Sequence, residues 1–170
     1  SPFVCADDDL AAATGRPVAE VLTTTAEDDF AGSCGGEGSK DVAFVWRAPF
    51  SDWFVFDTSG SDFDSVLYLR EGACDGPEVA CRGGNGAATE GPGVVRQVAR
   101  GDAFLIVVNG HSGSSGTAYL NIDRVTCPSD DLGTGASLPQ TYEFDAAATN
   151  RHGGDCGGDG EPERTFRFTP

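Results

Sequence analysis

The chain has 170 residues and a formal net charge of −16, because Asp and Glu outnumber Lys and Arg by 27 to 11. This excess of acid argues against a nucleic-acid-binding protein, which needs basic patches, and against binding to anionic membrane surfaces. A hydrophobic content of 39% excludes a disordered acidic tail, and the surplus of carboxylates favours affinity for divalent cations.

Short runs of β-branched and aromatic residues, separated by Gly, Ser, Pro and Asp, predict strands along the first 125 residues. The 24 glycines fit many tight turns. No segment has a convincing helical period, and no apolar run is long enough for a transmembrane helix. The pattern predicts an all-β fold, a β-sandwich of jelly-roll or immunoglobulin-like outline. In chain order, the expected strands are Val18–Thr23, Val42–Arg47, Trp53–Asp57, Ser65–Arg70, Glu78–Ala80, Val94–Ala99, Phe104–Asn109 and Thr117–Val125.

The sequence repeats itself at a spacing of 122 residues. At this shift Cys5 falls on Cys127 and Cys34 falls on Cys156, and no gap is needed from residue 5 to residue 48. The run DDL recurs in the same register, and CGGEG recurs as CGGDG. Two cysteines and two such runs in one register indicate a tandem repeat.

Residues 5–126 are therefore expected to form one complete β-sandwich repeat, with residues 1–4 as the end of a preceding strand or a linker. Residues 127–170 match the N-terminal third of a second repeat and are too few to bury a sandwich core by themselves. Further chain or a neighbouring molecule would complete this repeat, and strand donation is a known binding mode. The chain begins with Ser1, as a processed or excised piece of a secreted protein would.

An even number of cysteines in a Gly-rich β chain predicts disulfides and an oxidising compartment. A zinc site is the weaker interpretation, because it would use close CxxC pairs and the chain has none. One 29-residue interval between cysteines occurs in each repeat, so we expect one bridge per interval and a third bridge in the remaining pair, with pairing across repeats as the alternative. The expected bridges are Cys5–Cys34, Cys127–Cys156 and Cys74–Cys81.

Three stretches resemble a known family: DVAFVWRAP from Asp41, FVFDTSGSDFDSVLYLREGAC from Phe54, and GDAFLIVVNGHSGSSGTAYLNI from Gly101. They look like a repeat of secreted myxobacterial-type proteins and are similar to the bacterial pre-peptidase C-terminal domain, a calcium-tolerant β-sandwich. The resemblance implies a non-catalytic, extracellular accessory or adhesive module, often in tandem. In clostridial collagenases a related module binds collagen and takes calcium near its N-terminal acidic linker.

Acidic runs occupy the same place in both repeats, and rows of hard carboxylate oxygens suit Ca²⁺. A solvated or capping acidic turn is the alternative interpretation. Asp62 and Asp64, in the turn after Phe56, are secondary candidates. The candidate calcium ligands are Asp7, Asp8, Asp9, Asp130, Asp131, Asp62 and Asp64.

The run Asp57-Thr58-Ser59-Gly60-Ser61 matches DxSxS, the metal-adhesion motif of von Willebrand A domains. That fold alternates strands with helices, and no helical segment follows here. We therefore expect these side chains to cap backbone amides in a tight turn, with a metal-dependent adhesion domain as the weaker alternative.

The chain lacks the usual catalytic motifs. It has two histidines, His111 and His152, and no G-x-S-x-G, P-loop or H-E-x-x-H pattern. We therefore expect no enzyme activity. Most aromatic residues should lie in the core, and Trp46 and Trp53 are the candidates for a surface platform that stacks on a ligand.

The sequence thus predicts a disulfide-stapled, all-β sandwich repeated at 122 residues, from an extracellular or cell-surface protein. The expected role is structural or adhesive: a building block of a surface fibre, joined to itself or to neighbouring repeats through shared strands. The alternative is an accessory module of a secreted hydrolase that binds extracellular protein or polysaccharide. Ca²⁺ is the one cofactor expected, and neither nucleic acid binding nor membrane insertion is expected.

Overall fold

The fold was analysed in a computed structural model of the chain. Backbone is described for residues 2–84, 91–125, 130–134 and 166–169, and side chains are described as far as residue 125. The chain divides into two compact units, Ser1–Arg124 and Val125–Pro170, at a point close to the predicted repeat boundary. The two units are described separately here.

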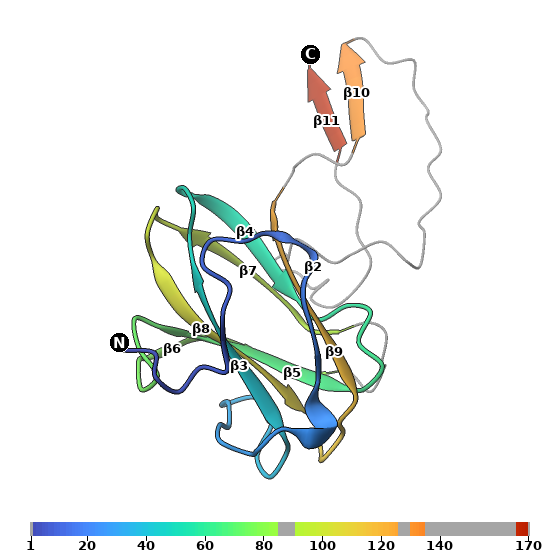
Figure 1. Cartoon of the computed structure of the whole chain (residues 1–170). Helices are drawn as coiled ribbons and strands as arrows, with labels where there is room; N and C mark the ends of the chain where they lie inside the picture. The colour runs from blue at the N-terminus through green and yellow to red at the C-terminus, as the bar shows by residue number, and fades with distance from the viewer. Residues whose placement is uncertain (1, 85–90, 126–129, 135–165, 170) are drawn as a thin grey trace. The chain divides into compact units, whose positions relative to one another are not determined.

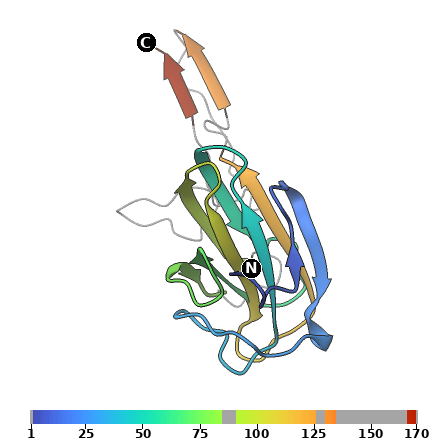
Figure 2. The same cartoon turned by 60° about the vertical axis from the view of Figure 1, so that its left-hand side comes forward.

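Unit 1 is a sandwich of two sheets (Figures 1 and 2). A five-stranded sheet has the order β1-β3-β8-β5-β6, and a four-stranded sheet has the order β2-β9-β4-β7. The predicted all-β, disulfide-bonded sandwich is therefore confirmed. The strands are β1 (Asp8–Asp9), β2 (Gly15–Leu22), β3 (Asp41–Arg47), β4 (Asp52–Asp57), β5 (Ser65–Glu71), β6 (Glu78–Arg82), β7 (Gly93–Val98), β8 (Ala103–Gly110) and β9 (Thr117–Arg124).

All eight predicted strands are present, with ends within a few residues of the predicted ones. The sequence analysis missed β1, a two-residue strand that pairs in parallel with β3 at the edge of the five-stranded sheet. A single 3₁₀ turn, Thr23–Thr25, is the only helical segment in the described residues, and no helix there is long or apolar enough to cross a membrane.

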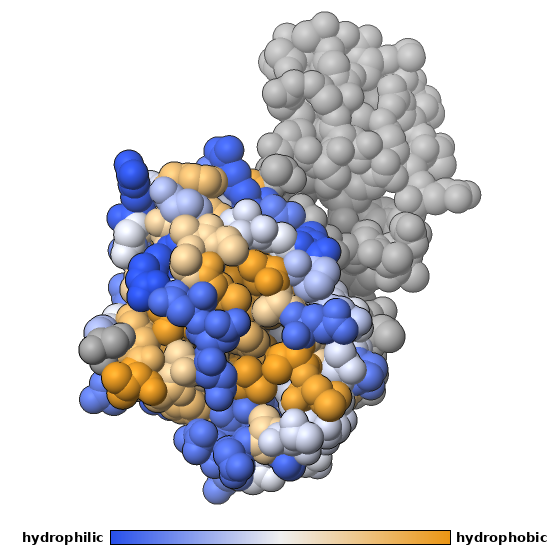
Figure 3. Space-filling view, in the orientation of Figure 1, coloured by the Kyte–Doolittle hydropathy of each residue, from blue (hydrophilic) through white to orange (hydrophobic). Residues whose placement is uncertain are grey.

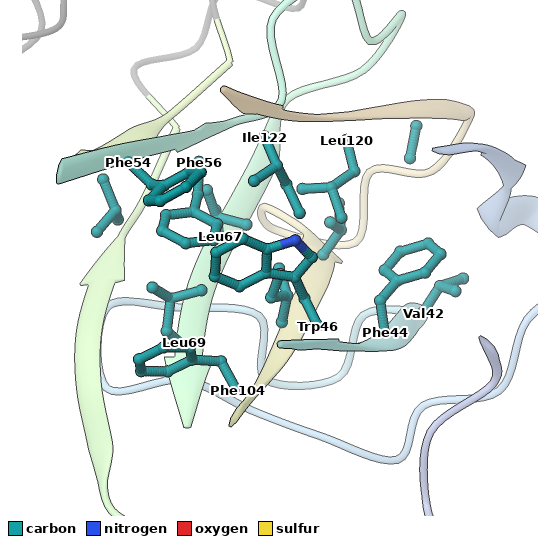
Figure 4. Close-up of a cluster of buried hydrophobic side chains, with 14 of the residues drawn as sticks. Val42, Phe44, Trp46, Phe54, Phe56, Leu67, Leu69, Phe104, Leu120 and Ile122 are labelled. Carbon is teal, nitrogen blue, oxygen red and sulfur yellow. The ribbon is translucent and has the colours of Figure 1, made fainter. Parts of the chain in front are cut away.

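The core between the two sheets is centred on the side chain of Trp46, which is fully buried (Figure 4). Its ring lies 5.1 Å from that of Phe54 and 5.2 Å from that of Phe56, both edge-on, and it stacks on Phe104 at 6.4 Å. Trp46 and Phe104 come from one sheet and the other two rings from the facing sheet. Such aromatic pairs stabilise more than their buried area alone. The indole N–H donates to the carbonyl of Ala13 at 2.8 Å, so the core also fixes the segment that leads into β2.

The outer face of the five-stranded sheet is buried as well. Tyr68, Leu105 and Val107 are fully buried on that face in a second cluster, which also contains Phe3. The cover consists of the N-terminal segment and the loop before β3, so Phe3, Cys5 and Ala6 pack onto this sheet. Burial on both faces explains why β3, β5 and β8 have continuous apolar sequences without alternation.

Unit 2 contains one described pair of strands, β10 (Asp130–Thr134) and β11 (Phe166–Thr169). They run parallel, with Asp130 opposite Phe166 and Asp131 opposite Arg167. A shift in register follows before Thr134 lies opposite Thr169.

We predict that Trp46→Phe lowers the free energy of unfolding by about 1–3 kcal/mol, because it removes core volume and leaves the Ala13 carbonyl without its donor. Trp53→Phe is the matched control on an exposed site and should change stability by less than about 0.5 kcal/mol. Urea titration followed by far-UV circular dichroism measures both. An equal decrease in the free energy of unfolding for the two variants would contradict the central position of Trp46.

Candidate functional site

The acidic run at the N-terminus lies beside β3 and is occupied by hydrogen bonds. The Asp7 carboxylate accepts the backbone N–H of Ala43 at 2.8 Å. Asp9 accepts the N–H of Ala11 at 2.8 Å and forms an ion pair with Arg47 at 2.8 Å. The bond from Ala11, and next the bond from Arg47, lower the pKa of Asp9. These carboxylates therefore act as local caps and an edge-strand ion pair.

The turn after β4 is built on Asp57, a buried carboxylate. Arg16 donates to both of its oxygens, at 2.8 and 3.3 Å, and the side-chain amide of Asn121 donates at 2.6 Å. The backbone N–H of Ser59 adds a further bond at 3.0 Å. In the described residues Asp57 is thus engaged by protein donors, as the capping interpretation of DxSxS predicts.

Asp62 and Asp64 in the same turn have different partners. Asp62 accepts the backbone N–H of Thr117 at 2.7 Å, which ties the turn to the start of β9. A carboxylate oxygen of Asp64 lies 2.9 Å from the Nδ1 atom of His111, in the loop after β8. Both carboxylates hold loops together.

No group of three or more His, Cys, Asp or Glu side chains gathers as a metal site within the described part of the chain. Among the candidate ligands, Asp7 and Asp62 accept separate backbone amides, and Asp9 also pairs with a cation. Asp130 and Asp131 are described only as backbone in β10, and His152 lies outside the described residues. Calcium binding stays a prediction.

The two tryptophans differ completely in exposure. Trp46 is 0% exposed, so the prediction that it belongs to a surface platform is wrong. Trp53 is 48% exposed and lies opposite Gln97 on the outer face of the four-stranded sheet. Phe50 is also exposed, and the guanidinium of Arg124 lies 5.5 Å from its ring centre. Figure 3 shows apolar and hydrophilic side chains interspersed on one face of unit 1.

The predicted bridges Cys5–Cys34 and Cys74–Cys81 are wrong, although all four cysteines are in disulfides. The bonds are Cys5–Cys74 and Cys34–Cys81. Each joins a cysteine of the cover on the five-stranded sheet to the β5–β6 hairpin, at sequence separations of 69 and 47. Loops of this length stabilise by about 4 kcal/mol per bond in the chain-entropy model. Cys127 and Cys156 lie outside the described residues.

A buried polar cluster beneath the loop before β3 was missed. The side-chain amide nitrogen of Asn109, at the end of β8, lies 3.0–3.3 Å from the carbonyl oxygens of Phe30, Gly36 and Ser39. It is also 3.3 Å from a carboxylate oxygen of Asp41. Gly36 has φ +94°, and a Cβ there would lie 2.8 Å from the Asn109 side chain. The VVNG sequence at the end of β8 was the available signal.

Asp41 completes this cluster from the start of β3. One of its oxygens accepts the backbone N–H groups of Asp29 and Phe30, at 2.9 and 3.0 Å. The pKa of Asp41 is raised to about 6, chiefly by burial. The two backbone bonds lower it in part, and the nearby charges of Asp29 and Asp28 add to the rise. The arrangement is a structural clamp for the loop.

We predict that Asp41→Asn gains stability relative to the unchanged chain as the pH rises from 4 to 7. The folded pKa of Asp41 lies above its unfolded value, so its favourable contribution is complete only below about pH 4 and is lost as the pH rises through about 6. The shift in relative stability should be about 1–3 kcal/mol, measured by urea titration at both pH values. Asp75→Asn, in an exposed loop, is the matched control. If the difference in stability between Asp41→Asn and the unchanged chain does not depend on pH, the raised pKa of Asp41 is contradicted.

The chain matches no family model and no curated protein. Among solved structures, it is similar to the pre-peptidase C-terminal domain of a collagenase from Bacillus anthracis, with a TM-score of 0.46 and 8% identity. The match covers 69% of this chain and 96% of that one. We base no functional argument on a likeness this distant.

Proposed function

We propose that the chain is a non-catalytic, extracellular structural repeat, a building block of a surface fibre or filament in which units share strands. The observation that carries this proposal is a common register in the two units. In unit 1 Asp8 lies opposite Phe44 and Asp9 opposite Val45; 122 residues later, Asp130 lies opposite Phe166 and Asp131 opposite Arg167.

The shift in register that follows these paired residues also recurs in both units. The backbone N–H of Arg47 donates to the carbonyl of Ala11 at 2.7 Å, so the strand beside β3 contains one more residue than β3 over this stretch. In unit 2, Thr134 lies opposite Thr169 after a shift of the same size. Recurrence of one supersecondary unit at a fixed spacing is the organisation of a tandem array.

The disulfides and the charge support an extracellular setting. Two bonds that close long loops are typical of proteins that fold in an oxidising compartment. A net charge of −16 keeps separate chains apart by repulsion, so assembly would need specific pairing of strands or bound cations. In this proposal, Ca²⁺ is the cation that would offset the repulsion between neighbouring chains.

An accessory module that binds polysaccharide or protein is the second candidate. It is favoured by Trp53, an indole 48% exposed on the face of a rigid sheet, with the amide of Gln97 opposite it on β7. An exposed aromatic face beside polar groups can stack on a sugar ring.

We predict that the purified chain forms regular filaments at micromolar concentration in electron micrographs, because unit 2 offers strands for pairing with another molecule. A chain of residues 1–125, which retains the core and both disulfides of unit 1, is the control and should remain monomeric. Loss of filaments in EDTA would indicate that divalent cations take part in the contact between units. Monodisperse particles from the full chain would contradict the fibre proposal.

If the chain is an accessory module, it should sediment with an insoluble polysaccharide. Trp53→Ala should then weaken binding by about 10-fold or more, as expected for loss of one stacked ring. The control is Phe50→Ala, which removes an aromatic ring of similar exposure outside the strands. Equal sedimentation of all three chains would contradict a platform at Trp53.

A further inference from the structure

The four-stranded sheet of unit 1 has β2 at one edge and β7 at the other (Figure 2). Within the described residues, β2 pairs with β9 alone and β7 pairs with β4 alone. Neighbouring strands of this sheet are antiparallel throughout, so β2 and β7 run in opposite directions. A second copy placed beside the first in the same orientation therefore brings its β7 antiparallel to β2.

The outer edge of β2 presents backbone groups of Glu20 and Leu22. The N–H of Thr23 donates to the carbonyl of Gly116 at 2.8 Å, so the backbone groups of Thr23 and Val21 point toward β9. Because these groups alternate along an antiparallel strand, the N–H and C=O of Glu20 and Leu22 point away from the sheet. Both residues are exposed, Leu22 at 50%.

The outer edge of β7 presents two residues in the same way. The N–H of Thr58 donates to the carbonyl of Pro92 at 3.2 Å, so the backbone groups of Pro92 and Val94 point toward β4. Those of Val95 and Gln97 point away from the sheet by the same alternation. The residues that present backbone groups at the two edges, named edge residues below, are Glu20, Leu22, Val95 and Gln97.

The edge residues have their side chains on one face of the sheet. Their alternate neighbours Val21 and Val94 pack in the core between the two sheets, so the side chains of the edge residues lie on the outer face. Opposite residues of paired strands point to the same face of a sheet. Pairing of β2 with β7 of a second copy therefore keeps the outer faces of the two copies on the same side.

One register suits both edges. It places Leu22 opposite Val95, an apolar pair, and Glu20 opposite Gln97, whose side-chain amide can donate to the carboxylate. The charges favour this arrangement over pairing of like edges. Two β2 edges would bring two Glu20 carboxylates close together, whereas residues 93–100 contain two arginines and no acid.

We infer that copies of unit 1 join head to tail, with β2 of one copy paired antiparallel with β7 of the next. A contact between two different edges does not close on itself, so its repetition extends the four-stranded sheet along an open filament. One pair of short strands is a weak contact and leaves separate chains monomeric at micromolar concentration. It forms where units are held at about millimolar effective concentration, as in an array. The inference rests on the fibre of the proposed function and assigns it a contact.

The test is amide hydrogen exchange of the 170-residue chain at about millimolar concentration. Leu22→Pro removes an outward N–H at a residue whose φ of −91° is close to that of proline, and it leaves the bonds to β9 in place. Exchange at Val95 and Gln97 should become about 2-fold faster or more, although they lie at the opposite edge of the sheet. Leu22→Val keeps the donor and is the matched control, with no such change expected.

The reciprocal variant is Val95→Pro, which should speed exchange at Glu20 and Leu22 to the same extent. A mixture of ¹⁵N-labelled Leu22→Pro chain with unlabelled Val95→Pro chain should restore slow exchange at Val95 and Gln97 of the labelled chain. The amide of Val107, in the buried strand β8, should stay protected in every variant and reports an intact fold.

Gln97→Glu tests the same contact without a change in the backbone. It places two carboxylates opposite each other and should speed exchange at Leu22 and Val95, and the added change Glu20→Gln should restore slow exchange. Exchange at β7 that is unaffected by Leu22→Pro and by Gln97→Glu would overturn the inference. If filaments form regardless of these changes, the fibre proposal stands without this contact. If the reciprocal effects occur and no filaments form, the contact is real and the fibre proposal fails.

Discussion

The structure of unit 1 depends on a sheet whose three central strands are apolar on both faces. β3, β8 and β5 bury one set of side chains against Trp46 and the facing sheet, and the other set around Tyr68 and Leu105. An antiparallel sheet more often leaves one face in water. Here each face needs a cover, and the second cover is made of loops that have no regular structure of their own.

The disulfides and the buried polar cluster follow from that requirement. A loop packed over a sheet brings carbonyl groups out of water, and each needs a donor. The two N–H groups of the Asn109 side chain are shared among three loop carbonyls, and Asp41 accepts two loop N–H groups. The two disulfides then join the cover to the hairpin at the edge of the same sheet. Covalent bonds and a polar clamp together stabilise this layer.

The strands were predictable because each is a short run of strand-forming residues bounded by turn residues, a purely local signal. The cover was not predictable, because it depends on which segments lie over the sheet. Equal intervals between cysteines indicated bridges within each interval, but the bonds join segments brought together by the order of the strands. Trp46 and Trp53 could not be distinguished from sequence for a related reason. β3 is buried on both faces and does not alternate, so its sequence contains no signal for which side chains face solvent.

The same logic applies to the second repeat. Residues 127–170 contain counterparts of Cys5, of the strand β1, of Cys34 and of the end of β3, which in unit 1 are the cover and one strand of the sheet beneath it. Counterparts of β5 and β8, which provide most of the apolar surface under that cover, are not among them. A cover without its sheet has little to bury, and a single parallel pair of strands is not stable alone in water. In the proposed fibre, strands shared by a neighbouring unit would provide that sheet.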